Sequence, residues 1–187
     1  MPDPVRSVTL RDGATIMLRP IRPEDESELT ALYSRLSPET AYQRFFSVMA
    51  RLPPDWARIL ANVDYDKRMA IVAVAPGSQL IGVARYDYDD AAKEAEIALV
   101  VQDGWQGKGL GTILLRELLA YAATKGIHRF RAYVLGDNRR MLDLLARTTQ
   151  VLDRYTERGV TSLLLAHLPP RDAAGPGGDA AAGGGAP

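Results

Sequence analysis

The chain has 187 residues, of which 47% are hydrophobic and 25% are charged, the balance of a soluble globular domain. Lysine plus arginine equals aspartate plus glutamate at 23 each, so no excess of charge calls for nucleic acid or an anionic membrane as a partner. Because the sequence has no cysteine, it excludes disulfides, thiolate metal sites and a cysteine nucleophile.

The first third of the chain is predicted to be a lead-in, one strand and three helices. Residues 1–13 contain acids and prolines but no apolar core, so they are not a signal peptide. Residues 14–19 predict a strand. Acids in a first turn after Pro23, followed by apolar residues at i, i+3, i+4 and i+7, predict a helix. Ser37 and Pro38 favour the start of a second helix, and a third is predicted at residues 53–62.

Strands dominate the rest of the chain. Apolar runs bounded by turn residues predict strands at 69–75, 80–88, 94–101, 129–135, 151–156 and 161–168. Between them, helices are predicted at 110–125, where leucines line one face, and at 139–147. The apolar run MAIVAVA has seven residues, against about 20 for a membrane-spanning helix.

This order of elements predicts an α/β (α+β) fold, in which helices cover both faces of a mixed central sheet. We expect one domain at residues 14–168. The last 19 residues, 169–187, are almost all Pro, Gly, Ala and Asp, and we expect a disordered tail because they have little apolar surface to bury. The expected location is the cytoplasm.

The stretch WQGKGLGTILL places three glycines before a helix of leucines. The first N–H groups of a helix have no partner inside it, and together with the helix dipole they suit a phosphate. Glycines let an anion approach those groups closely. The spacing fits neither a Walker A loop, because Lys108 precedes Gly109, nor the G-x-G-x-x-G fingerprint of dinucleotide-binding proteins. Plain packing of the strand–helix turn is the alternative explanation.

What the stretch does contain is Gln106-x-x-Gly109-x-Gly111. This resembles the Q/R-x-x-G-x-G/A signature of the GNAT superfamily of N-acetyltransferases, and the resemblance covers roughly residues 10–168. It implies a GNAT-like three-layer fold, in which helices flank a mixed and mostly antiparallel central sheet. It also implies acetyl-CoA as cosubstrate, with no metal. In that family the turn holds the pyrophosphate of coenzyme A, and the strand before it pairs with the pantetheine arm. The cofactor-binding residues implied in this way are Ala98, Leu99, Val100, Gln106, Gly107, Lys108, Gly109, Leu110, Gly111, Thr112 and Asn138.

The resemblance also implies a catalytic carboxylate. Glu96 matches the acid of the family's strand before the turn, so it is the candidate general base that takes the proton of an attacking amine. The alternative is that Glu96 forms an ion pair with an arginine of a neighbouring strand, such as Arg85 or Arg131. Glu94 lies one strand period away on the same face, and we expect it at an exposed strand start.

Other candidate groups stay open at this stage. Many relatives have a tyrosine as general acid where this chain has Leu145, so either the thiol leaves unaided or Tyr133 or Tyr155 serves. The residues Tyr42, Arg44, Phe45 and Phe46 either line an acceptor groove or face the core. The two histidines, His128 and His167, have no spacing typical of a metal site, and we expect His128 at the surface.

The opening LRDGATIMLRPIRPEDESELTALYSRLSPETAYQRFF resembles bacterial protein lysine acetyltransferases of the Pat type. This resemblance implies transfer of an acetyl group to the side-chain amine of a protein lysine, for example on an acyl-CoA synthetase, by direct attack in a ternary complex. Two alternatives remain: an acetyltransferase for small amines, and a non-catalytic domain that binds acyl-CoA as a sensor.

Overall fold

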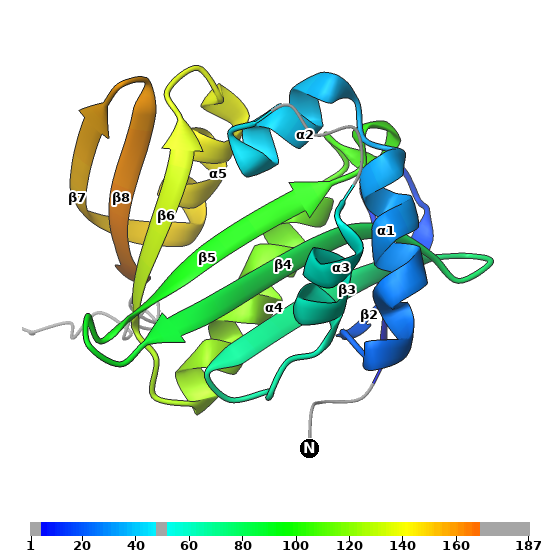
Figure 1. Cartoon of the computed structure of the whole chain (residues 1–187). Helices are drawn as coiled ribbons and strands as arrows, with labels where there is room; N and C mark the ends of the chain where they lie inside the picture. The colour runs from blue at the N-terminus through cyan, green and yellow to red at the C-terminus, as the bar shows by residue number, and fades with distance from the viewer. Residues whose placement is uncertain (1–4, 48–51, 169–187) are drawn as a thin grey trace, which may run out of the picture.

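The computed structural model describes residues 5–47 and 52–168. Within them, eight strands form one sheet in the order β1-β2-β3-β4-β5-β6-β8-β7 (Figure 1). Every neighbouring pair is antiparallel except β5 and β6, which are parallel. The strands are β1 Arg6–Thr9, β2 Thr15–Pro20, β3 Arg68–Ala75, β4 Gln79–Asp89, β5 Glu94–Val101, β6 Arg129–Leu135, β7 Thr149–Glu157 and β8 Val160–His167.

Five α-helices cover the sheet in the described part of the chain. They are α1 Glu26–Ser34, α2 Pro38–Phe45, α3 Pro54–Ala61, α4 Leu110–Thr124 and α5 Arg139–Thr148. One face of the sheet carries α1 and α3, the other carries α4 and α5, and α2 lies at the end of β5 (Figure 1). The three-layer arrangement, with a mixed and mostly antiparallel sheet, is therefore confirmed. No helix in this part of the chain is long and apolar enough to cross a membrane.

Each face of the sheet has its own hydrophobic core. Leucines of α4, such as Leu114 and Leu118, are fully buried against the sheet on one side. On the other side, Leu29 and Leu32 of α1 pack with residues of β3 and β4. Strand β3, the predicted apolar run, is buried at every position after its first, because helices cover both of its faces.

The N-terminal lead-in contains a strand that the sequence did not predict. Strand β1 pairs with β2, so that Val8 lies opposite Ile16. It has four residues with exposed or intermediate side chains, and such a short strand gives almost no apolar alternation to detect.

The predicted tail at residues 169–187 lies outside the described residues. Helix α1 also begins later than predicted, because Pro23–Asp25 form a 3₁₀ turn before it.

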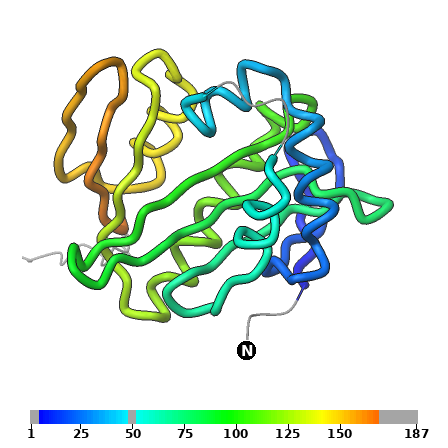
Figure 2. Tube along the Cα trace, in the orientation of Figure 1, coloured from blue at the N-terminus to red at the C-terminus, as the bar shows by residue number. Residues whose placement is uncertain are grey.

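The sheet opens between β5 and β6. These two strands pair only at Ala95 with Phe130 and at Glu96 with Arg131, and beyond Glu96 their traces diverge (Figure 2). The following residues of β5, up to Val101, keep their β4 partners but have no strand on the β6 side. An unpaired strand edge presents backbone N–H and C=O groups, so this gap is where an extended ligand can add to the sheet.

Candidate functional site

A cleft of about 240 Å³ occupies the gap between β5 and β6. Its lining combines residues 96–101 of β5 with the glycine turn, helices α2 and α5, and Tyr133 of β6. The candidate residues Ala98, Leu99, Val100, Gln106, Gly107, Gly111 and Asn138 all belong to this lining, as does Glu96. The structure therefore brings most of the predicted site together. Lys108 and Gly109 of the turn, and Leu110 and Thr112 of the first turn of α4, are not part of the lining.

The glycines of the turn serve different purposes. Gly107 and Gly109 have φ angles of 76° and 89°, a left-handed conformation that costs other residues about 1–2 kcal/mol. Gly109 is also the N-cap of α4. A Cβ at Gly111 would instead lie 3.4 Å from Leu144 and 3.5 Å from Leu99, which are ordinary van der Waals distances. Backbone geometry therefore explains Gly107 and Gly109, whereas packing does not require a glycine at 111.

The side chain of Gln106 holds the turn in place. Its Nε2 donates to the carbonyl of Val101 at 2.9 Å, and its Oε1 accepts from Arg140 of α5 at 2.9 Å. Its backbone N–H donates to the carbonyl of Asp103 at 3.1 Å, which leaves the N–H groups from Gly107 onward for an anion. Asn138 is similarly engaged, because its Oδ1 accepts from the N–H of Met141 and caps α5.

The β1–β2 turn packs against the glycine turn, a contact that the sequence did not reveal. Lys108 Nζ lies 2.9 Å from an Asp12 carboxylate oxygen and 4.9 Å from the ring centre of Trp105. Lys108 is therefore not a free, solvated lysine. The hydrogen bond from Lys108 holds the pKa of Asp12 below its ordinary value. Arg11 donates its N–H to the Lys108 carbonyl at 3.2 Å and adds a second cation beside the turn.

Helix α2 is fixed to the same turn through Asp103. The Asp103 carboxylate accepts from the Ser37 N–H at 2.9 Å, and from the hydroxyls of Ser37 and Thr40 at 2.7 Å each. Partial burial disfavours the charged carboxylate, but these hydrogen bonds outweigh it, so the pKa of Asp103 lies below its ordinary value. Ser37 also caps α2 by accepting from Thr40 N–H, as the sequence predicted.

The two glutamates of β5 have different surroundings. Arg131 makes two hydrogen bonds to Glu94, at 2.8 and 3.1 Å, and the Glu94 side chain is only 17% exposed. The expectation of an exposed Glu94 was therefore wrong, because the neighbouring strand supplies a bidentate partner. Glu96 is exposed and lines the cleft, and in the described residues it has no ion pair. Arg131 thus pairs with the other glutamate.

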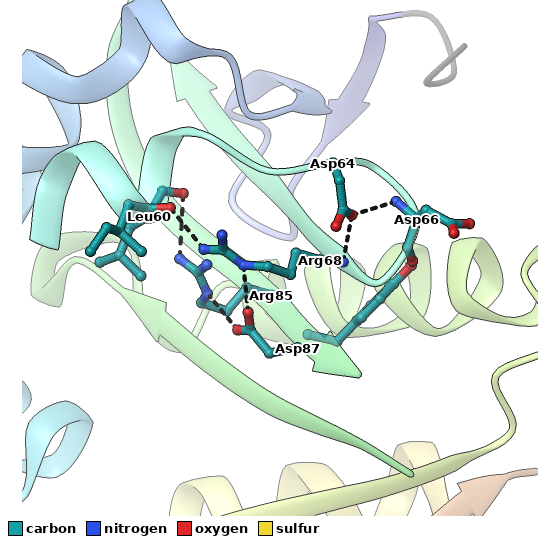
Figure 3. A network of polar contacts seen from close by, with 8 residues as sticks. Leu60, Asp64, Asp66, Arg68, Arg85 and Asp87 are labelled. Atoms are coloured by element: carbon teal, nitrogen blue, oxygen red, sulfur yellow. Dashed lines mark hydrogen bonds and ion pairs between the residues drawn. The ribbon is translucent and has the colours of Figure 1, made fainter. Parts of the chain in front are cut away.

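Arg85 lies on β4, the strand next to Glu96, and belongs to a network of polar contacts (Figure 3). It is 4% exposed and shares the carboxylate of Asp87 with Arg68, at 3.4 and 2.9 Å. Its Nη1 also donates to the carbonyl of Leu60 at the end of α3, at 3.5 Å. Burial lowers the pKa of the Arg85 guanidinium. This network holds α3 on the sheet and leaves Glu96 free, although Asp87 lies directly opposite Glu96 in the β4–β5 register.

The candidate residues for the general acid and for the acceptor groove lie in different places. Tyr133 and Leu145 line the cleft, whereas Tyr155 does not. In α2, Arg44 and Phe46 line the cleft, but Phe45 packs between Tyr33 and Trp56, at ring distances of 5.1 and 6.2 Å. Tyr42 is exposed and is not part of the lining. The predicted aromatic set is thus divided between groove, core and surface.

The histidines form no metal site in the part of the chain that the structure describes. His128 is exposed, as expected, and its ring lies 5.9 Å from that of His167. Burial lowers the pKa of His167, whose ring packs on Phe130 at 5.4 Å. Residues 5–47 and 52–168 contain no group of three His, Cys, Asp or Glu arranged to hold a metal ion.

The family model described as "Acetyltransferase (GNAT) family" matches residues 28–149. The chain belongs to the GNAT acetyltransferases. It is therefore an acyltransferase of a family that uses acetyl-CoA. Acetyltransferase PA5475 from Pseudomonas aeruginosa is 32% identical over 139 residues, which cover 73% of this chain and 75% of that protein.

Two Pat proteins are also similar to this GNAT chain. Acetyltransferase Pat from Mycolicibacterium smegmatis is 34% identical over 144 residues, which span 75% of this chain but only 42% of Pat. The crystal structure of the GNAT domain of S. lividans PAT superposes with a TM-score of 0.80 at 33% identity, and the match covers 87% of this chain and 96% of that domain. The similarity to Pat from M. smegmatis is thus confined to less than half of that protein.

Proposed function

We propose that this GNAT enzyme transfers the acetyl group of acetyl-CoA to the side-chain amine of a protein lysine, with Glu96 as general base. The observation that carries the proposal is the position of Glu96. It is the last residue of β5 that pairs with β6, and it is exposed and lines the cleft. Its register partner on β6, Arg131, pairs with Glu94 instead.

The cleft offers a place for each part of acetyl-CoA. The unpaired edge of β5 at Ala98, Leu99 and Val100 suits the pantetheine arm, because its amides can pair with a strand backbone. The N–H groups of residues 107–112 at the start of α4 suit the pyrophosphate. Arg11 adds positive charge beside them, because its Nε would lie 3.3 Å from a Cβ at Gly109, whereas Lys108 is already paired with Asp12. Asn138 lines the cleft at α5.

The chemistry needs a base because a lysine amine is protonated near neutral pH. Its ordinary pKa is about 10.4, so deprotonation at pH 7 costs about 4.6 kcal/mol. In the proposed step the ammonium gives a proton to Glu96, and the neutral nitrogen attacks the thioester carbonyl carbon. The carbon–sulfur bond then breaks and coenzyme A leaves as the thiolate. The second proton, which the nitrogen loses as the amide forms, passes to that thiolate, so the products are the acetylated lysine and the coenzyme A thiol. The chain has no cysteine, so a cysteine acyl-enzyme is excluded. Direct attack of the amine on acetyl-CoA is therefore favoured.

A protein acceptor is supported by the similarity to the two Pat proteins and by the opening segment that resembles Pat-type protein lysine acetyltransferases. An acyl-CoA synthetase is the acceptor that this resemblance suggests. A small amine would use the same half of the cleft for acetyl-CoA, so the acceptor itself must be tested.

The experiment measures release of the coenzyme A thiol by wild type, Glu96→Gln and Glu94→Gln. Two acceptor pools are offered: an acyl-CoA synthetase with other lysine-bearing proteins, and a panel of small amines. Loss of a general base lowers the rate by about 100-fold or more, so Glu96→Gln should lose that factor while acetyl-CoA binding persists. Glu94→Gln, which keeps the free carboxylate at Glu96, should lose less than about tenfold.

Transfer to small amines alone would show that the acceptor is a small amine and not a protein lysine, and would leave the proposed mechanism unchanged. Equal activity of Glu96→Gln and wild type would rule out the assigned base. No transfer to either pool by a wild type that binds acetyl-CoA would favour the sensor alternative.

A further inference from the structure

The last three strands of the sheet have one face that no helix covers. On the other face of β6 and β8, Phe130, Ala132 and Leu165 are buried in the core beneath α4 and α5. Figure 1 shows α5 behind β6, and no helix in front of β6, β8 and β7. On β7, every residue after the first is exposed, which is unusual for a strand that belongs to an eight-stranded sheet.

The strand register shows which side chains share this face. Tyr133 of β6 lies opposite Ser162 of β8, which lies opposite Tyr155 of β7. The adjacent row runs from Arg131 through Leu164 to Asp153. Residues directly opposite in a ladder point to the same side of a sheet. We call the surface formed by these six residues, Arg131, Tyr133, Asp153, Tyr155, Ser162 and Leu164, the open face.

The open face continues directly into the catalytic cleft. Arg131 is the register partner of Glu96, so Glu96 lies one strand spacing, about 4.8 Å, from its border. Tyr133 belongs to both, because it lines the cleft and begins the row that ends at Tyr155. A surface seated on the open face would therefore place a flexible lysine side chain within reach of the Glu96 carboxylate.

The chemistry of the open face suits a protein surface that carries lysines. Tyr155 is 61% exposed and Tyr133 is 47% exposed, and tyrosine is enriched where proteins bind one another. Arg131 is neutralised by Glu94. Asp153 makes no ion pair within the described residues, and its Oδ1 accepts only the Arg154 backbone N–H at 2.8 Å. The outer end of the row therefore carries a negative charge, which attracts a basic partner.

The size of the open face favours a transient contact. Three strand spacings separate β5 from β7, which is about 14 Å, and the two rows extend a few residues along the strands. The area is on the order of a few hundred Å², whereas a stable complex buries about 800 Å² on each partner. A permanent dimer would need more surface, but an enzyme that must release its product needs only a weak contact.

We infer that the open face is the docking surface for a folded, lysine-bearing protein acceptor. This inference rests on the proposed function, because it concerns how that acceptor reaches Glu96. In this view the acceptor is recognised at two places. The cleft binds the reacting lysine, and the open face binds the surface of the folded protein around that lysine.

The test compares one acceptor in two forms. The folded acyl-CoA synthetase is the first substrate, and the second is its digest by a protease that cleaves after glutamate and leaves the lysines inside peptides. Tyr155→Ala and Asp153→Lys are compared with Arg154→Ala, which lies on the same strand but belongs to the opposite face, since it pairs with Leu163. Steady-state kcat and KM are measured for each variant and substrate.

We expect Tyr155→Ala and Asp153→Lys to raise KM for the folded synthetase about five- to tenfold, and to leave kcat and the constants for the peptides unchanged. Arg154→Ala should match wild type with both substrates. Unchanged KM for the folded synthetase, or an equal change with the peptides, would overturn the inference and leave the proposed function standing.

Two further outcomes also decide the question. A wild type that sediments as a dimer, and that Tyr155→Ala converts to a monomer, would show that a second copy of the chain occupies the open face and would overturn the inference. A wild type that transfers acetyl groups to neither form of the synthetase would overturn the proposed function for this acceptor, and the docking surface with it.

Discussion

The two sides of the cleft belong to regions of the sheet that are built differently. Strands β3 and β4 are buried along almost their whole length, because α1 and α3 cover one face and α4 covers the other. Strands β6 and β8 are buried on one face only, and β7 is exposed from its second residue onward. We call the first region, β3 and β4 with the ladder to β5, the frame, and the second region, β6, β8 and β7, the arm.

This difference explains how the protein can open its sheet without losing stability. The frame keeps β5 in place through a continuous antiparallel ladder with β4. The arm is attached to β5 by only two register pairs and by the packing of α5 and α4. The unpaired edge of β5 therefore lies at the boundary of the two regions, where a ligand can use it without disturbing either core.

The largest expected effect tests this contrast through stability. Leu114 is fully buried in the frame, whereas Leu152 of β7 is 44% exposed. Leu114→Ala should lower the free energy of unfolding by about 2–5 kcal/mol because it leaves a cavity. Leu152→Ala should change it by less than about 0.5 kcal/mol. Urea denaturation of both variants measures the difference, and similar losses would show that the arm is as tightly packed as the frame.

The elements of the frame were predictable from the sequence for a physical reason. Strands with both faces covered are continuous apolar runs, so residues 69–75 were recognised to within one residue of β3 Arg68–Ala75. Strand β1 was missed because it is four residues long and mostly exposed. Strand β7 begins two residues earlier than predicted, because Thr149 continues the chain directly from α5 without a turn residue between them.

Local parts of the site were predictable, and contacts across the chain were not. The glycine turn and Glu96 lie within one stretch of strand, turn and helix, and their spacing carries the family signature. The hydrogen bonds from Ser37 to Asp103 join residues 66 positions apart, and Lys108 pairs with Asp12, which lies near the other end of the sequence. No spacing rule relates such residues, because the fold alone brings them together.

The second prediction concerns the glycine turn, which follows β5 at the boundary between the frame and the arm. Gly109 and Gly126 both have positive φ, at 89° and 73°, so alanine at either position should cost about 1–2 kcal/mol of stability. A Cβ at Gly109 would also lie 3.3 Å from Arg11, whereas a Cβ at Gly126 meets nothing within 4 Å. Gly109→Ala should therefore also weaken acetyl-CoA binding about tenfold, a change of about 1.4 kcal/mol.

Calorimetric titration with acetyl-CoA checks this prediction, and Gly126→Ala is the matched control with the same backbone strain outside the cleft. We expect the control to bind acetyl-CoA like wild type. If both variants lose affinity equally, general destabilisation would explain the loss, and the turn would have no specific part in binding the pyrophosphate.

The smallest expected effect concerns the attachment of α2 beside the cleft. Asp103 accepts three hydrogen bonds from Ser37 and Thr40, and these hold its pKa below the ordinary value although partial burial opposes them. Asp103→Asn removes the charge and one acceptor oxygen, which should lower the free energy of unfolding at pH 7 by about 1 kcal/mol. Asp55→Asn, in an exposed ion pair with Arg58, should change it by less than about 0.5 kcal/mol.

The pH dependence gives this last prediction a sign. Because the folded state lowers the pKa of Asp103, its carboxylate stabilises the fold at pH values above the unfolded pKa of about 3.9. That stabilisation is lost as the pH falls through the folded value. The difference in unfolding free energy between wild type and Asp103→Asn should therefore be full at pH 7 and shrink below about pH 4. A difference that stayed constant over this range would mean that shape, and not the charge of Asp103, attaches α2 to the turn that begins the cleft.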